Sequence, residues 1–124
     1  MKLSDGWGYG GLCVVNLYPF RSSSPAECRR WAAWKNNGPD WDARDVLQKN
    51  ALTVGALAQR AALTVAAWGA ATWATNWAEQ LIEDHLPERL FCLGTTTDGA
   101  PKHPLARGKH RVPDDVVPVR WCRP

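Results

Sequence analysis

The sequence predicts an α/β fold, with a three-layer α/β/α arrangement around a small and mainly parallel sheet. Three short apolar runs of strand length are separated by two longer segments with helical periodicity. Strands that alternate with helices in this way form parallel sheets through right-handed crossovers. The chain has 124 residues, which is enough for one compact domain.

The first half of the chain predicts one strand and two helices. The apolar run Leu12–Leu17 predicts a buried strand, and the polar Asn16 interrupts it near its end. A short helix is predicted over Ala26–Trp34, after a loop rich in proline and serine. A longer helix is predicted from Trp41 to Ala61, and its apolar stripe consists of Val46, Leu47, Val54 and Leu57.

The second half repeats the alternation of strand and helix. Ala62–Gly69 is a continuous apolar run, which is typical of a strand that is covered on both faces. Ala70 to Leu86 predicts an amphipathic helix, and Glu88–Gly94 predicts a third buried strand. The residues that follow predict a long loop, and "VVPVRW" predicts a short edge strand, which Pro118 disfavours. The apolar face of the second helix consists of Trp73, Trp77 and Leu81.

The cysteines and the hydropathy indicate a cytoplasmic protein without a metal or cofactor. The four cysteines show no CxxC spacing and have no histidine at the spacing of a metal site. Cys13 and Cys92 fall within predicted strands, so they are expected to be buried free thiols in a reducing compartment. No apolar run has the length of a membrane span, and no signal peptide is visible.

Positive charge is concentrated near the end of the sequence. Residues 1–100 carry nine Lys or Arg against ten Asp or Glu, whereas residues 101–124 carry six against two. We therefore expect an α/β domain over residues 1–105, followed by a basic loop or tail over 106–124. Such a segment either attracts a polyanion or is only a solvated tail, and charge alone leaves both open.

Polar residues follow the predicted strands where each strand ends. Ligands of parallel sheets bind at the carboxyl ends of the strands. Those ends are here Asn16, Trp68–Gly69, and Gly94 with the loop that contains His103. Asn16 either binds a ligand or caps its own chain. His103 is either a site residue or an ordinary surface histidine, and the same holds for the loop residue Arg21.

The stretches "GWGYGGLCVVNLYPFRSSSP", "NNGPDWD", "VAAWGA" and "CLGTTTDGAPKHPL" span residues 6–105 in this order. Together they resemble an uncharacterised family of bacterial and phage domains of the DUF1643 type. Members of that family begin with an earlier strand that ends in an Asn-Pro-Ser-Thr motif. The resemblance therefore implies that this chain lacks the family's first strand.

The order of these motifs is also similar, more distantly, to the uracil-DNA glycosylase superfamily. The similarity implies a glycosylase-like fold in which Asn16 reads a base edge and His103 donates a hydrogen bond to the base carbonyl as the catalytic residue. Leu105 stands where that superfamily usually has a serine, so the phosphate contact of this loop is not expected. The predicted ligand-binding residues are Asn16, Tyr18, Phe20, Arg21, Trp68, Gly69 and Pro104, with the aromatic ones as stacking surfaces.

Two functions follow from these patterns. The first is a nucleobase-, nucleotide- or nucleic-acid-binding domain of glycosylase-like fold, which would be a DNA-glycosylase-like hydrolase if it were active. In that superfamily the first strand carries the water-activating residue, so the resemblance implies binding without efficient turnover. The second is a non-catalytic accessory or protein-interaction module of phage or mobile-element origin.

Overall fold

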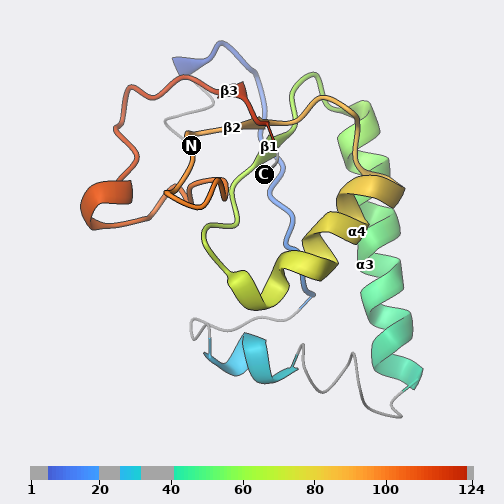
Figure 1. The fold of residues 1–124 in the computed structure, drawn as a ribbon. Coiled ribbons are helices and arrows are strands. Elements are labelled where there is room, and N and C mark those ends of the chain that lie inside the picture. Colours follow the sequence, from blue (N-terminus) through green and yellow to red (C-terminus); the bar gives the residue numbers. More distant parts are fainter. Residues whose placement is uncertain (1–5, 20–25, 32–40, 123–124) are drawn as a thin grey trace. The chain divides into compact units, whose positions relative to one another are not determined.

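A computed structural model describes residues 6–19, 26–31 and 41–122. Residues 26–31 form a short helix, which agrees with the prediction as far as that segment is described. Helices together with a small sheet make the chain an α/β protein, as the sequence predicts. The remaining elements are α3 (Trp41–Arg60), β1 (Val65–Ala66), the 3-10 helix η1 (Thr72–Ala74), α4 (Thr75–His85), β2 (Phe91–Cys92), the 3-10 helix η2 (Gly108–His110) and β3 (Val119–Arg120) (Figure 1).

The chain divides into two compact units. One, which we call the sheet unit, consists of Met1–Val15, Ala61–Ala71 and Pro87–Pro124. The other, the helical unit, consists of Asn16–Arg60 and Thr72–Leu86. The sheet unit contains all three labelled strands, and the helical unit contains α3 and α4.

The sheet has the strand order β1-β2-β3. β1 and β2 are parallel, with Ala66 opposite Cys92, so the predicted parallel pairing of the second and third apolar runs is confirmed. β3 is antiparallel to β2, with Val119 opposite Cys92, and it confirms the predicted edge strand. Because β3 lies beyond residue 105, the basic segment returns to the sheet at its end.

The predicted strand over Leu12–Leu17 is wrong. Residues 11–16 belong to no helix or strand, and the side chains of Leu12, Val14 and Val15 are 51%, 73% and 42% exposed. Cys13 and Asn16 are exposed as well, which corrects the expectation of a buried thiol and a buried amide. An apolar run becomes a strand only where another strand satisfies its backbone, and no strand of the described residues pairs with this one.

The core of the helical unit lies between α3 and α4. The buried face of α3 consists of Leu47, Ala51 and Val54, at helical spacing. This corrects the predicted stripe, because Val46 is exposed. On the second helix the prediction holds for two of three residues: Trp77 and Leu81 are buried, whereas Trp73 is half-buried and lies in η1. The buried residues of α4 are Trp77, Ala78, Leu81 and Ile82.

The sheet unit has a smaller core around the strands. It consists of Ala66, Leu90, Cys92, Leu93, Pro101, Val112 and Trp121. Only Ala66 and Cys92 lie in strands, because each strand is only two residues long, and Leu90, Leu93 and Trp121 lie directly before or after one. Among the described residues, no helix is long and apolar enough to cross a membrane.

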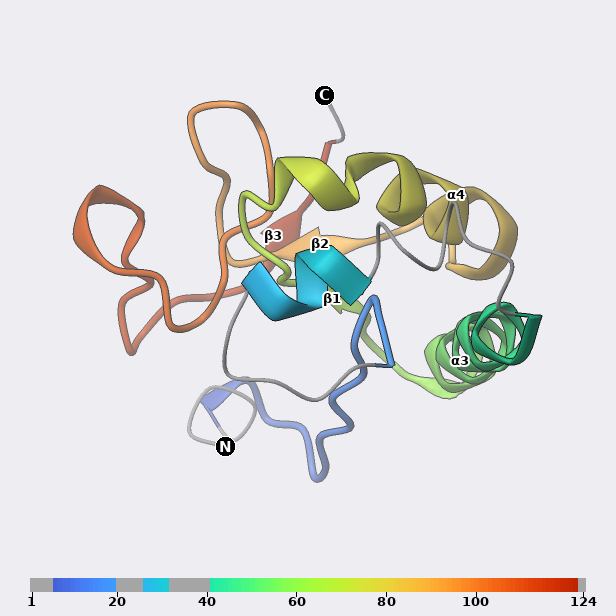
Figure 2. The same cartoon turned by 90° about the horizontal axis from the view of Figure 1, so that it is seen from below.

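A glycine sets the close approach of α3 to the end of α4 (Figures 1 and 2). A Cβ atom built on Gly55 would lie 3.0 Å from the carbonyl oxygen of His85 and 3.1 Å from its Cβ. A larger side chain therefore has no space at this position unless the helices move apart.

We expect Gly55→Val to destabilise the protein by about 1–3 kcal/mol through overpacking. Valine is a better helix former than glycine, so the loss cannot come from helix propensity. The exposed neighbour Ala56 supplies the matched control. Ala56→Val should cost only about 0.5 kcal/mol, by propensity alone. Chemical denaturation of both variants measures the difference, and equal losses would contradict the close packing.

The four cysteines are all free thiols, and they differ in exposure. Cys13 and Cys122 are exposed, whereas Cys92 lies in β2 and is 1% exposed. Burial raises the pKa of the half-buried Cys28 thiol above its ordinary value. The nucleophile in alkylation is the thiolate, so a raised pKa leaves less reactive thiol at a given pH.

Alkylation of the native protein near pH 8, followed by mass spectrometry, should therefore modify Cys13 and Cys122 first. Cys28 should react more slowly, with a rate that continues to rise at higher pH because its thiolate forms later. Cys92 should react only after denaturation. Early modification of Cys92 would contradict the packing of β2.

Candidate functional site

The carboxyl ends of the two parallel strands meet at one edge of the sheet unit. After β1 the chain reaches Gly69, and after β2 it reaches Gly94. Both glycines have positive φ angles, 79° and 104°. Glycine adopts such angles without the steric cost that a side chain brings, which allows the chain to turn sharply there.

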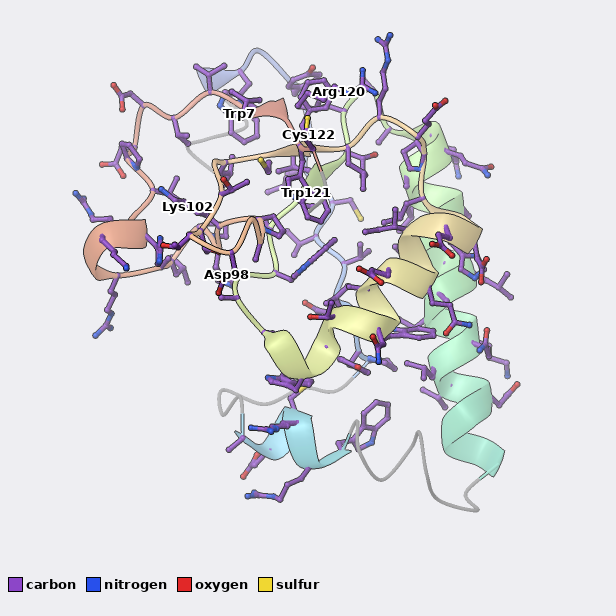
Figure 3. All side chains as sticks on the ribbon, in the orientation of Figure 1. Trp7, Asp98, Lys102, Arg120, Trp121 and Cys122 are labelled. Atoms are coloured by element: carbon purple, nitrogen blue, oxygen red, sulfur yellow. The ribbon has the colours of Figure 1, made fainter. Side chains whose placement is uncertain are left out.

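The residues after Gly94 form a hairpin. Thr96 N–H donates to the carbonyl oxygen of Ala100 at 2.8 Å, and Gly99 N–H donates to that of Thr96 at 3.0 Å. The hydroxyl of Thr96 accepts a further bond from Ala100 N–H. "TTTDGAP", predicted only as loop, is therefore a hydrogen-bonded turn that sends the chain back toward the strands (Figure 3).

The returning arm of this hairpin is fixed to both strand ends. Gly69 N–H donates to the carbonyl oxygen of Pro101 at 2.9 Å, and Lys102 N–H donates to that of Gly94 at 3.0 Å. A Cβ atom on Gly69 would lie 3.4 Å from the Cβ of His103. A Cβ atom on Gly94 would lie 3.4 Å from the Cδ of Lys102. Lys102 and His103 thus stand at the carboxyl edge of β1 and β2, and with Gly69 and Gly94 they form what we call the strand-end site.

His103 begins a tight turn, and a hydrogen bond within this turn sets the tautomer of its neutral ring. Ala106 N–H donates to the carbonyl oxygen of His103 at 3.0 Å, with Pro104 at the second position of the turn, where proline is favoured. Leu105 N–H donates to Nδ1 of the His103 ring at 3.0 Å. Because Nδ1 accepts, the proton of the neutral ring is on Nε2. His103 is exposed and presents Nε2–H as a hydrogen-bond donor.

A pair of tryptophans packs next to the hairpin turn of the strand-end site. Trp121 is 9% exposed, and its indole N–H donates to the carbonyl oxygen of Gly99 in the hairpin turn at 3.0 Å. Its ring meets the half-buried Trp68 edge to face, with centroids 5.4 Å apart. In Figure 3, Trp121 lies on the side of the strands that faces the hairpin, and Arg120 extends from the other side.

Other predicted site residues have different surroundings. Tyr18 is 4% exposed and stacks on Trp73 with a centroid separation of 5.6 Å. It also contacts the rings of Trp31 and Trp77. A ring buried in this way belongs to the core of the helical unit and offers no open stacking surface for a base.

Asn16 is exposed, and its carbonyl oxygen accepts a hydrogen bond from the side-chain amide of Asn50 at 2.9 Å. It belongs to the helical unit, whereas His103 belongs to the sheet unit. The predicted cooperation of these two residues stays a prediction. Phe20 and Arg21 lie outside the described residues.

Lys102 lies at the strand-end site, whereas the sequence indicated it only as one of the six Lys or Arg of residues 101–124. Its position directly before His103, in a loop that follows a strand ending in glycine, is the signal that could have identified it. The described residues contain no group of three His, Cys, Asp or Glu that could hold a metal ion. The strand-end site itself offers the Nε2–H donor of His103 and the ammonium group of Lys102, and Trp68 directly precedes Gly69.

The ring state of His103 can be tested by NMR. We expect nitrogen-15 spectra of the histidine rings, recorded above the pH at which imidazoles are protonated, to show His103 with the proton on Nε2. Substituting Leu105 by proline removes the donor to Nδ1 and should abolish this preference. Finding the proton on Nδ1 in the unsubstituted protein would contradict the turn.

Comparison with known proteins identifies a family for this chain. Searches among curated proteins and among solved structures found no match. The profile of a family described as "Protein of unknown function (DUF1643)" matches residues 1–105, which include the strand-end site. The chain therefore belongs to this family.

Proposed function

We propose that this protein binds a nucleobase, as part of a nucleotide or a nucleic acid, at the strand-end site. The observation that carries the proposal is the donor Nε2–H of His103, whose ring is held by Leu105 N–H beside Lys102. Both side chains lie where parallel α/β sheets usually bind ligands, at the carboxyl ends of the strands.

The donor and the cation suit different parts of one ligand. A neutral Nε2–H group pairs well with a base carbonyl oxygen, and a lysine pairs with phosphate. The half-buried Trp68 directly precedes Gly69 in sequence and is proposed as the stacking surface, since base–aromatic stacking is worth about 1–3 kcal/mol per base.

Base release is a further step that this site would support only in part. A donor aimed at the base carbonyl stabilises negative charge on a leaving base, as an oxyanion hole does. Efficient hydrolysis also needs an activated water, and a positioned general base typically supplies about 10²–10⁴-fold. We therefore propose binding as the main function, with release of a base as a reaction to be assayed.

A protein-interaction module is the second candidate, and one observation favours it. Leu12, Val14 and Val15 are exposed on an extended segment of the sheet unit. Three exposed apolar side chains within four residues of sequence favour a contact with a partner. Loss of binding to every nucleotide probe would favour this function over the first.

We expect His103→Ala to weaken binding of a fluorescently labelled, uracil-containing single strand by about three- to tenfold. That range corresponds to the loss of one net hydrogen bond of about 0.5–1.5 kcal/mol. His103→Gln keeps an N–H donor on a side chain of similar reach and should recover part of the affinity. Fluorescence anisotropy measures both, with thermal melting as a check that each variant folds.

Unchanged affinity in His103→Ala would contradict the proposal. The same samples report on catalysis when base release from uracil-containing DNA is assayed in parallel. Release that is rapid and depends on His103 would show that the site is an enzyme active site, and not only a binding site.

A further inference from the structure

We propose that the ligand is a single-stranded nucleic acid and not a free nucleotide, and that its phosphates run along a basic loop next to the strand-end site. This inference rests on the proposed function and extends it from one base to a polymer. The basic loop comprises residues 107–111, and its cations are Arg107, Lys109 and Arg111.

The basic loop exposes three positive charges and itself contains no acidic residue; the acidic residues that come before and after it in sequence are Asp98, Asp114 and Asp115. Arg107, Lys109 and Arg111 are all exposed, and His110 is half-buried. From residue 99 to residue 113 the sequence contains no Asp or Glu. A local field of one sign attracts a polyanion and is not cancelled within the segment.

The loop is also held in a defined conformation. It contains η2, and its turn is closed by a hydrogen bond from Arg111 N–H to the carbonyl oxygen of Gly108 at 3.1 Å. Gly108 has a φ of 68°, and the following Val112 is 6% exposed and anchors the loop in the core of the sheet unit. Figures 1 and 2 show this segment extending away from the three strands.

The two ends of the basic loop connect it to the elements that build the site. Its start follows the turn of His103 directly, since Ala106 N–H bonds the carbonyl oxygen of His103. Its far end leads to β3, which pairs with β2. A backbone that is held in this way loses little conformational freedom on binding, whereas the backbone of a solvated tail would lose much.

The number of cations distinguishes a polymer from a single nucleotide. A nucleoside monophosphate carries a single phosphate, which Lys102 beside His103 already suits. Three further cations, separated along the loop, have no partner on such a ligand but match successive phosphates of a strand. In the proposed function the base also stacks on an indole, and a base can do so only when it lies outside a duplex stack, so a single strand fits and a duplex does not.

The test compares two variants that have the same net charge. In the first, Arg107, Lys109 and Arg111 are replaced by alanine. In the control, Arg29, Arg30 and Arg60 are replaced by alanine; all three are exposed and belong to the helical unit. The probe is a labelled oligothymidylate of about 12 nucleotides, within the range of known single-strand sites. Its binding is followed by anisotropy across a series of salt concentrations.

We expect the loop variant to lose about tenfold or more in affinity at low salt. Its slope of log K against log salt should become shallower by about 2, since each phosphate contact on a single strand contributes about 0.7. The control variant should keep the slope of the unsubstituted protein. Thymidine monophosphate should compete only weakly, and the corresponding duplex should bind less tightly than the single strand.

Three results would overturn the inference. Equal losses in both variants would show that net charge alone acts, and an unchanged loop variant would show that the loop makes no contact. Thymidine monophosphate binding as tightly as the oligonucleotide, but still sensitive to His103→Ala, would exclude the polymer and leave the proposed function intact. If His103→Ala changes nothing with any probe, the proposed function itself fails.

Discussion

The sheet unit depends on Trp121, because its strands are too short to hold together by their own hydrogen bonds. Each strand has two residues, so the ladder contributes few bonds. Trp121 adds a backbone bond from its N–H to the carbonyl oxygen of Leu90 at 2.9 Å, directly beside the ladder of β2 and β3. Its indole then bonds the hairpin turn at Gly99 and packs on Trp68 after β1. Burial of an aromatic side chain of this kind removes roughly 150–250 Å² of its surface from water. Trp121 thereby links β2, β3 and the residues after β1 to the hairpin turn.

The same contacts hold the backbone of the strand-end site in place. The indole holds the turn of the hairpin, the buried Pro101 accepts from Gly69 N–H, and the next residue, Lys102, donates to Gly94. His103 follows with its ring held by Leu105 N–H. The donor therefore stands on a backbone that is bonded at both strand ends, and a ligand would not have to order it.

The sequence predicts those parts of the fold that depend on local pattern. Helical periodicity is sufficient for α3, and the continuous apolar runs that end in glycine are sufficient for β1 and β2. The same reasoning fails at Leu12–Leu17, because apolar residues show what could be buried and not whether a partner strand is present. The sequence indicates His103 as a candidate because its loop follows a strand end, and its role as a site residue stays a prediction. The position of Lys102 beside it depends on the hairpin turn and is not visible in the sequence. The burial of Tyr18 is not visible there either, because it depends on three tryptophans distant in sequence.

The two functions that the sequence leaves open differ in the forces they would use, and the sheet unit has a surface suited to each. Lys102 and the basic loop offer charge, so binding through them must weaken as salt rises and counterion release is lost. The extended segment with Leu12, Val14 and Val15 offers apolar area, and such contacts are insensitive to moderate salt or strengthened by strongly excluded salts. The two surfaces therefore predict different effects of salt on the affinity for a partner. An affinity that falls as salt rises indicates Lys102 and the basic loop, whereas an affinity that stays constant or rises indicates the segment with Leu12, Val14 and Val15.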